Sequence, residues 1–310
     1  MKLHTLPHTK FYSGKVRDVY SLGNYIFIIA SDRISAFDHI LPKTIPYKGA
    51  VLNQISTYLL NETKHLVPNW LIDSPCSHFS IGYNCPSIPI EIIVRGYLAG
   101  SMWRAYEKGI RWFCGNELPE GLKKNQKLPY PIITPTTKAA EGHDMDTTEE
   151  EILASGVVTS AEWELIKEYA FKIFEFGTKY ANEKNLILVD TKFEFGRKNE
   201  DEIILIDEIL TPDSSRYFIK DSYETHFESG AEPQQLSKEF VRQWLIDQGF
   251  MGREGDEMPE MSEAWVHEIS EKYIELYNKL IGQNFVKETS QFNIQTIQSC
   301  YDDFNLRHSS

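Results

Sequence analysis

Two acidic residues in the segment 185–208 have the spacing of a metal site. Two apolar runs in this segment, separated by a polar stretch, predict a β-hairpin. If its loop centres on Glu200 and Asp201, Glu194 pairs across the strands with Asp207, and their carboxylates lie roughly 5 Å apart. Such a pair repels unless a cation lies between its members. Because Mg²⁺ accepts a few carboxylate ligands when nucleotide phosphates and water complete its shell, the hairpin predicts Mg²⁺-nucleotide chemistry.

Two further charged residues share this predicted strand face. Asp190 and Lys192 lie on the same side as Glu194, because neighbouring side chains of a strand point to opposite faces. The other face turns Val189 and Phe193 into packing. An alternative stays open, in which the charges form a solvated strand face and the lysine bridges the acids.

Residues 94–101 have the composition of a phosphate-binding loop. Gly96 and Gly100 let the backbone approach a ligand closely, and Ser101 stands at a predicted helix start, where free N–H groups attract anions. Arg95 adds a forked cation. A structural turn with a helix N-cap accounts for the same residues, so both interpretations stay open.

Two other basic positions suit an anionic ligand. Arg216 ends a Pro-Asp-Ser turn directly after the acidic strand, and Lys15, next to Gly14, lies where a lysine reaches phosphate oxygens. The sequence has neither a Walker loop nor a Rossmann glycine fingerprint. Nucleotide binding therefore requires another scaffold.

Two polar segments, 31–38 and 137–144, are predicted to be loops, and their residues alone do not assign them a function. His143 is expected to be an exposed loop residue, because no second histidine stands at ligand spacing.

The charge balance restricts the class of partner. The chain has 32 Lys and Arg against 45 Asp and Glu, a formal net charge of −13, which opposes binding to nucleic acid or an anionic membrane. An anionic substrate therefore needs a local basic pocket. No apolar run is long enough to span a bilayer, and four cysteines without a C-x-x-C pair favour reduced thiols in the cytoplasm.

The elements that position these residues predict two lobes. Residues 1–89 form a small β-rich lobe with a hairpin turn at 22–24, and residues 90–310 form the larger lobe. The segments 74–89 and 116–146 are expected to be irregular, and the last dozen residues to fray. Helices are predicted over 50–61, from Ser101, over 160–184 behind a capping box of Thr159 and Glu162, and from Ser262 to Gly282.

Taken together, five segments in order resemble the SAICAR synthetase family, whose enzymes are phosphoribosylaminoimidazole-succinocarboxamide synthases. The resemblance spans most of the chain, and its most specific parts read ILVDTKFEFG and IDEILTPDSSRY. The segments are 14–20, 31–38, 94–101, 186–196 and 207–217.

The resemblance implies an ATP-dependent carbon–nitrogen ligase of purine biosynthesis. It would join L-aspartate to the carboxylate of carboxyaminoimidazole ribonucleotide through an acyl phosphate, giving SAICAR, ADP and phosphate. ATP and Mg²⁺ are the implied cofactors, and the partners are small molecules, with monomer and homo-oligomer both open. The alternatives are a small-molecule kinase that uses the same Mg²⁺-ATP site and a regulatory module that has lost catalysis.

The resemblance also assigns residues. Glu194 and Asp207 look like the Mg²⁺ ligands, and Arg95, Ser101 and Arg216 resemble the clamp on the substrate 5′-phosphate. Lys192, Asp190, Lys138 and Asp144 are implied near the reacting groups, the last two on a segment that closes near the substrates. The implied ATP-binding residues are Gly14, Lys15, Arg17, Asp18, Asp32, Arg33 and Ser35.

The implied fold is α+β, a small β-rich lobe over a larger lobe of ATP-grasp type, with the nucleotide between them. The stretch 138–143 is one residue shorter than the commonest family pattern, which leaves the register of Glu141 and Asp144 open.

Overall fold

The computed structural model describes residues 10–138, 145–200, 202–287 and 293–308. They form two compact units. Unit 1 takes the described residues up to Asn61, Trp70–Asn84 and those from Glu239 onward, and unit 2 takes Glu62–Asn69 and Cys85–Lys238. The division expected at Pro89 differs from this one, because the chain returns to unit 1 after Lys238 instead of ending in the second lobe.

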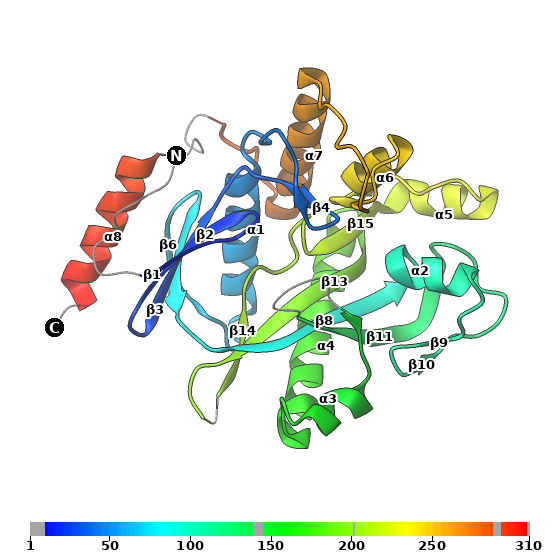
Figure 1. The fold of residues 1–310 in the computed structure, drawn as a ribbon, viewed down its shortest axis with the longest axis horizontal. Coiled ribbons are helices and arrows are strands. Elements are labelled where there is room, and N and C mark those ends of the chain that lie inside the picture. The colour runs from blue at the N-terminus through cyan, green and yellow to red at the C-terminus, as the bar shows by residue number, and fades with distance from the viewer. Residues whose placement is uncertain (1–9, 139–144, 201, 288–292, 309–310) are drawn as a thin grey trace. The chain divides into compact units, whose positions relative to one another are not determined.

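Unit 1 is built on a five-stranded antiparallel sheet in the order β1-β2-β3-β7-β6 (Figure 1). Its strands are β1 (Lys10–Ser13), β2 (Arg17–Leu22), β3 (Tyr25–Ala30), β6 (Leu71–Cys76) and β7 (Phe79–Tyr83). The short strands β4 (Ser35–Ala36) and β5 (His39–Ile40) pair with each other, and the helices are α1 (Lys48–Thr63), α6 (Glu239–Asp247), α7 (Glu263–Ile281) and α8 (Ile294–His308).

The predicted hairpin with its turn at 22–24 is confirmed, and it joins β2 to β3. Leu22 pairs with Tyr25 across a two-residue turn, and Gly23 at its first position has a φ of 55°, in the left-handed region that glycine adopts at little cost. The irregular connector expected over 74–89 is wrong, because β6, β7 and the start of the next strand occupy it. Pairing with neighbouring strands overrides the breaker residues there.

Helices cover both faces of the unit 1 sheet. Phe79 and Ile81 join the apolar cluster formed with α8, whereas Ser80 between them donates to Asn53 Oδ1 of α1 at 2.5 Å. Because side chains alternate along a strand, these two contacts lie on opposite faces. Figure 1 shows α1 and α8 on the two sides of this sheet.

The C-terminal residues form an ordered helix, so the expectation that the last dozen residues fray is wrong for those described. The α8 side chains Ile297, Tyr301 and Phe304 are buried in the sheet cluster. The Phe304 ring lies 5.0 Å from Tyr25 and 5.6 Å from Phe27, centroid to centroid. Apolar residues at helical spacing within a polar segment produce this packing.

Unit 2 is built on a seven-stranded sheet in the order β12-β11-β8-β13-β15-β16, with β14 paired to β13. Its strands are β8 (Ser87–Tyr97), β11 (Lys127–Thr137), β12 (Met145–Asp146), β13 (Leu186–Arg197), β14 (Ile203–Ile206), β15 (Ser215–Ile219) and β16 (Gln235–Leu236). The strands β9 (Trp112–Phe113) and β10 (Asn116–Glu117) form a separate pair, and the helices are α2 (Gly100–Glu107), α3 (Glu149–Ser155), α4 (Ser160–Glu183) and α5 (Lys220–Ser229).

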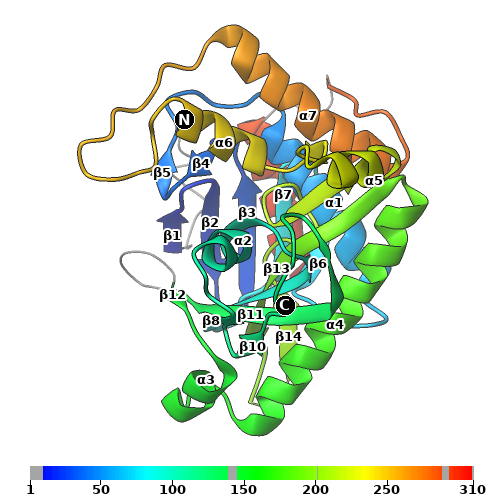
Figure 2. The same ribbon diagram turned by 90° about the vertical axis from the view of Figure 1, so that its right-hand side faces the viewer.

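The long helix α4 packs mainly against β13, and to a lesser extent against β8. Figure 2 shows α4 beside the sheet of unit 2. Its predicted capping box is confirmed, because the Thr159 side chain accepts from the Glu162 backbone N–H and the Glu162 side chain accepts from the Thr159 N–H. A Cβ on Gly177 would lie 2.9 Å from a methyl carbon of Leu210 and 3.0 Å from one of Leu188. The glycine therefore lets the helix pack closely on the sheet.

The loop expected over 116–146 is wrong for its described residues, because β11 occupies eleven of them. Its three prolines conceal the strand in the sequence, and a register shift between Lys127 and Ile132 accommodates the first two.

The helix from Ser262 to Gly282 is confirmed, with Ser262 as its N-cap and Gly282 left-handed at its end.

Mixed helix and antiparallel sheet agree with the α+β class, and the ATP-grasp architecture stays a prediction. Among the helices that the structure describes, none has the length and apolar character needed to cross a bilayer.

Replacing Phe304 by Ala tests the packing of α8. The side chain is 1% exposed, so we expect the free energy of unfolding to fall by about 3 kcal/mol, from lost burial and the cavity left behind. The matched control is Leu306→Ala on the same helix, at 81% exposure, which should change it by less than about 0.5 kcal/mol. Urea unfolding measures both, and equal effects would contradict the packing.

Candidate active site

One face of the unit 2 sheet holds charged side chains in rows set by strand register. In the pairing of β8 with β13, Arg95 lies opposite Asp190 and Glu91 lies opposite Glu194. On the other side of β13, Arg216 of β15 lies opposite Asp190. Because alternate residues share a face, these side chains converge on one side of the sheet.

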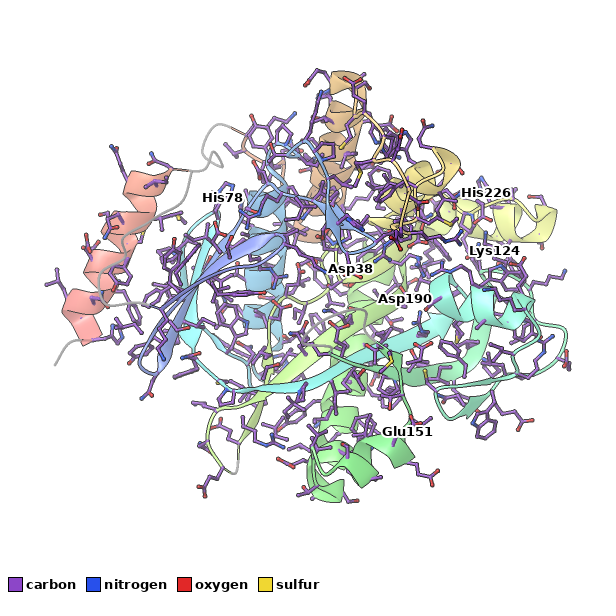
Figure 3. The ribbon with its side chains drawn as sticks, in the orientation of Figure 1. Asp38, His78, Lys124, Glu151, Asp190 and His226 are labelled. Atoms are coloured by element: carbon purple, nitrogen blue, oxygen red, sulfur yellow. The ribbon has the colours of Figure 1, made fainter. Side chains whose placement is uncertain are left out.

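The first group on this face is the arginine cluster, made of Arg95, Ser101, Asp190 and Arg216. Asp190 lies on β13 (Figure 3), and its Oδ2 accepts from Nη1 of Arg216 at 2.8 Å and from Nη1 of Arg95 at 3.2 Å. Arg95 also donates from Nη2 to Ser101 Oγ at 3.1 Å and from Nε to Thr134 Oγ1 at 2.8 Å. Both guanidinium groups are thereby held in fixed orientations.

The arginine cluster has an excess of positive charge. Two guanidinium groups share one carboxylate, and Gly100 begins α2 beside them after an N-cap, Ala99, that gives no side-chain cap. Burial lowers the pKa of Arg95 and Asp190 raises it, but a guanidinium stays protonated in either case. Two cations and a helix N-terminus together favour a bound anion.

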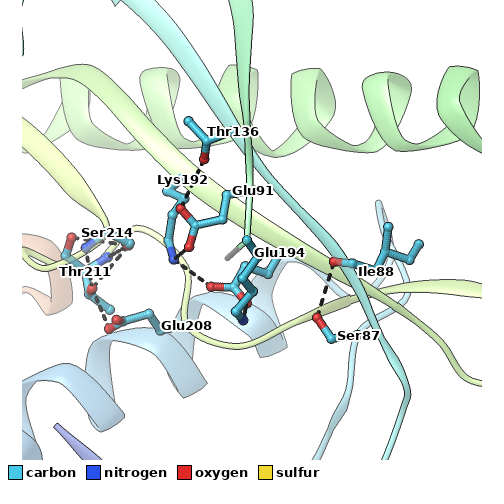
Figure 4. Close-up of polar contacts among 10 residues, drawn as sticks. Ser87, Ile88, Glu91, Thr136, Lys192, Glu194, Glu208, Thr211 and Ser214 are labelled. Carbon is cyan, nitrogen blue, oxygen red and sulfur yellow. Dashed lines mark hydrogen bonds and ion pairs between the residues drawn. The ribbon is translucent and has the colours of Figure 1, made fainter. Parts of the chain in front are cut away.

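The second group is the lysine–carboxylate cluster, made of Glu91, Lys138, Lys192 and Glu194. Figure 4 shows Lys192 beside Glu91 and Glu194. Lys192 Nζ donates to Glu91 Oε1 at 2.5 Å and to Glu194 Oε1 at 2.6 Å. Lys138 Nζ donates to the other oxygen of Glu194 at 2.5 Å. Thr136 donates to Glu91 Oε2 at 3.4 Å. Lys192 therefore bridges two acids, but these are Glu91 and Glu194, whereas the alternative interpretation expected Asp190 and Glu194.

The acids of this strand face are buried, so the solvated strand face of that alternative is wrong: Glu194 is 5% and Asp190 is 8% exposed. Burial raises the pKa of Glu194, but the Lys192 and Lys138 ammonium groups outweigh it and lower that pKa to about 2. Burial lowers the pKa of Lys192, but Glu194 and Glu91 outweigh it and raise that pKa. Glu194 and Lys192 therefore both stay charged near neutral pH.

The predicted hairpin forms, but its register is wrong by one residue. Glu194 lies opposite Ile206 instead of Asp207. β14 ends at Ile206, and Asp207 has a φ of 66°, so strand alternation does not extend to it. A one-residue change in register moves every side chain of a strand to the other face, so the shared-face argument for the two acids fails.

The chemistry of the donor set still suits a hard cation at Glu194. Both oxygens of this buried carboxylate already accept from ammonium groups, so its surroundings favour cations as partners. Among the described residues, there is no group of three or more His, Cys, Asp or Glu able to hold a metal. Mg²⁺ would therefore need substrate phosphates or water as its remaining ligands.

In unit 1, Arg33 organises the loop predicted to bind ATP phosphates. Its guanidinium donates to the carbonyl oxygens of Gly14 at 3.2 Å and Lys15 at 3.1 Å, and to Asp18 Oδ1 at 2.9 Å. The Lys15 ammonium pairs with Asp38, with both side chains about half exposed. The loop is thus fixed by its backbone, while its lysine stays accessible.

The other residues predicted on the nucleotide side take varied positions in unit 1. Asp32 Oδ1 accepts from the Gly49 N–H at 2.9 Å, at the start of α1. Arg17 begins β2 and Ser35 lies in β4. Asp144 lies outside the described residues, as do Glu141 and His143.

Sequence reasoning missed three residues that contact the charged groups, namely Glu91, Thr134 and Thr136. Apolar residues occupy alternate positions of β8, from Ile88 to Val94, and this pattern could have placed Glu91 on the same face as Arg95. The threonines belong to the strand that was expected to be a loop.

Comparison with known sequences shows the family. The SAICAR synthetase family model matches residues 10–259. A phosphoribosylaminoimidazole-succinocarboxamide synthase of Bacteroides fragilis is 53% identical over 279 residues, which is 89% of this chain and 88% of that protein. The synthase of Cytophaga hutchinsonii is also 53% identical over 279 residues, covering 90% of each chain.

Comparison with solved structures agrees with this family assignment. The SAICAR-synthase from Saccharomyces cerevisiae, complexed with SAICAR, has a TM-score of 0.77 at 32% identity and covers 92% of this chain and 99% of its own. A type-2 SAICAR synthetase in complex with ADP has a TM-score of 0.69 at 23% identity, with 89% of this chain and 100% of that chain covered, and shows the fold alone. The prediction of a carbon–nitrogen ligase of this family is confirmed. This chain belongs to the SAICAR synthetase family.

Proposed function

We propose that this chain joins L-aspartate to the carboxylate of carboxyaminoimidazole ribonucleotide, converts ATP to ADP and phosphate, and so makes SAICAR for purine biosynthesis. The observation that carries the proposal is the shared sheet face, where β8 and β13 each contribute a residue to the arginine cluster (Arg95, Asp190) and to the lysine–carboxylate cluster (Glu91, Glu194). The relatives bear the name of this reaction, and the Saccharomyces cerevisiae structure is complexed with its product.

The arginine cluster supplies the binding energy for the ribonucleotide 5′-phosphate. Its fork-shaped donors and the α2 N-terminus are the groups that recognise phosphate oxygens. Arg95 and Arg216 are already oriented by Asp190, so little side-chain entropy is lost when the phosphate binds. This cluster is the local basic pocket that the net charge of −13 requires.

The reaction needs ATP because a carboxylate is a poor acyl donor. In the proposed first step, a substrate carboxylate oxygen takes the γ-phosphoryl group of ATP and ADP leaves. In the second step, the aspartate amine attacks the acyl carbon, phosphate leaves and the amine loses a proton. Phosphoryl transfer depends on charge neutralisation and positioning.

The ammonium groups of Lys192 and Lys138 supply part of that neutralisation. Lys192 is fixed by Glu91 and Glu194, so its charge needs no reorganisation as negative charge develops on the phosphoryl oxygens. The Lys138 side chain is 43% exposed, so its ammonium group is accessible to substrate. Asp190 acts by orienting the two arginines.

The loop at the first strands of unit 1 is proposed to hold the ATP phosphates. Lys15 would exchange its pairing with Asp38 for a phosphate oxygen, and the backbone that Arg33 fixes would supply donors. The nucleotide-contacting set proposed is Gly14, Lys15, Arg17, Asp18, Asp32, Arg33 and Ser35.

Mg²⁺ would be held by Glu194 and Asp207, where it would neutralise phosphate charge and align the γ-phosphoryl group. Glu194 supplies a buried carboxylate with both oxygens directed at cations. Asp207 directly follows Ile206, the cross-strand partner of Glu194.

Omission of aspartate is the decisive test of the reaction. With ribonucleotide, ATP and Mg²⁺ present, we expect amide product only when aspartate is added, detected by mass spectrometry, and ADP release that requires the imidazole carboxylate. A kinase would release ADP and phosphorylate its acceptor at the same rate without aspartate. ADP formation unaffected by aspartate, with no amide product, would therefore reject the ligase.

Replacing Glu194 by Gln tests the metal role. Because the amide removes the ligand charge, we expect the Mg²⁺ concentration for half-maximal activity to rise at least about tenfold. Glu91→Gln is the comparison, since it also loses a charge beside Lys192 and should raise that concentration less than about threefold. Circular dichroism checks the fold, and an unchanged Mg²⁺ requirement in Glu194→Gln would remove this residue from the proposal.

Replacing Asp190 by Asn tests the arginine cluster. The buried guanidinium of Arg95 and the largely buried one of Arg216 would lose the carboxylate between them, so we expect the free energy of unfolding to fall by about 3 kcal/mol. Inorganic phosphate should raise the melting temperature of the variant more than that of the wild type, because a bound anion replaces the lost charge. Asp303→Asn, at an exposed position, is the control. Equal phosphate responses in all three proteins would contradict an anion site here.

A further inference from the structure

Gly100 is the first residue of α2 and has a φ of 58°, in the left-handed region. Its lack of a side chain leaves room for one particular group. A Cβ built on Gly100 would lie 2.7 Å from Nη2, 2.8 Å from Nη1 and 3.2 Å from Cζ of Arg216. Real Cβ atoms essentially never approach other atoms within 3.0 Å. The guanidinium of Arg216 therefore occupies the space that any other residue at position 100 would fill.

The guanidinium cannot yield this space at low cost, because it is held from the opposite side. Its Nη1 donates to Asp190 Oδ2 at 2.8 Å, and the same oxygen accepts from Arg95. A displacement of Arg216 would break a charge-assisted hydrogen bond in a nearly buried site, where the Arg216 side chain is 11% and the Asp190 side chain 12% exposed.

The placement also brings positive charge to a helix N-terminus. A cation at a helix N-terminus opposes the positive end of the helix dipole. Here the guanidinium stands at that end of α2, with the guanidinium of Arg95 as a second cation on Ser101, the next residue. The close approach therefore allows a bound anion to be shared by the guanidinium groups and the α2 backbone N–H groups.

We propose that Gly100 is a positioning residue, which sets the affinity for the substrate phosphate by letting Arg216 approach the N-terminus of α2. The inference rests on the proposed function, which places the substrate phosphate at this cluster. It differs from the sequence interpretation, in which the glycine makes room for the phosphate itself. Gly100 touches neither substrate nor reacting atoms in this role and acts through Arg216.

The chain offers a matched control for the backbone strain that alanine introduces at a positive φ. Gly156 has a φ of 70° at the end of α3, and a Cβ there would meet nothing within 4 Å. Gly156→Ala therefore introduces similar backbone strain with no collision. The comparison of Gly100→Ala with Gly156→Ala isolates the contact with Arg216.

Steady-state kinetics of the full chain is the first measurement. In Gly100→Ala we expect KM for the ribonucleotide to rise about tenfold or more, the effect of losing a charge-assisted contact. KM for ATP and aspartate should stay within about twofold, and Gly156→Ala should resemble the wild type. An equal rise in all three KM values, or the same loss in Gly156→Ala, would overturn the inference.

A double-mutant cycle with Arg216→Ala distinguishes the two roles of the glycine. If Gly100 acts through Arg216, the double variant loses no more phosphate affinity than Arg216→Ala alone. If the glycine makes room for the phosphate, the two losses add, which would overturn the inference. Should Gly100→Ala fail to fold, recovery of folding in the double variant would support the same steric conflict, and failure of both would count against it.

Binding of inorganic phosphate, followed by thermal shift, supplies a readout that does not need turnover. We expect the phosphate-induced stabilisation to decrease in Gly100→Ala and to be unchanged in Gly156→Ala. If the wild type binds phosphate but makes no amide, the proposed function fails while the role of Gly100 is still measured. If phosphate stabilises Gly100→Ala as much as the wild type, the role of Gly100 fails whatever the reaction.

Discussion

The register between β8 and β13 is the constraint on which the charged face of unit 2 depends. It sets Arg95 opposite Asp190 and Glu91 opposite Glu194, so each row of the sheet brings ionised groups side by side. Buried charges persist only when they are paired and hydrogen-bonded. At one end of the face, two arginines pair with one acid, Asp190. At the other end, two acids pair with one lysine, Lys192.

This arrangement gives the two ends of one sheet face different net charge. The arginine cluster keeps surplus positive charge and suits a permanent anion such as a phosphate ester. The lysine–carboxylate cluster is nearly balanced, with Glu194 between Lys192 and Lys138. Rigid strands fix the spacing between the ends, which is the geometry that a substrate with a phosphate at one end and a reacting carboxylate at the other requires.

The sequence was most informative where the signals are local. The capping box of Thr159 and Glu162 and the turn at Gly23 lie within a few residues of the elements they define, and both were predicted correctly. β11 was missed because its prolines argue against a strand, and only pairing with β8 reveals it. The register of the Glu194 hairpin was wrong by one residue, because composition alone does not fix loop length.

The candidate site shows the same difference between local signals and contacts of distant segments. Residue types identified Arg95, Arg216, Lys192 and Glu194 as candidates, since glycine, arginine and acidic patterns are visible in the chain. Their partners Glu91 and Thr134 come from strands far away in sequence, so contacts between distant segments were needed to find them.

The last described helix, α8, completes an apolar cluster whose other members lie on β2, β3 and β7 near the start of the chain. A ribosome makes those strands more than 200 residues before this helix. Until the helix has been made, the rings of Phe27 and Phe79 therefore lack the cover that Tyr301 and Phe304 later provide. Unit 1 can reach its final packing only after synthesis of α8, and until then its nascent sheet presents an apolar surface of the kind that chaperones bind.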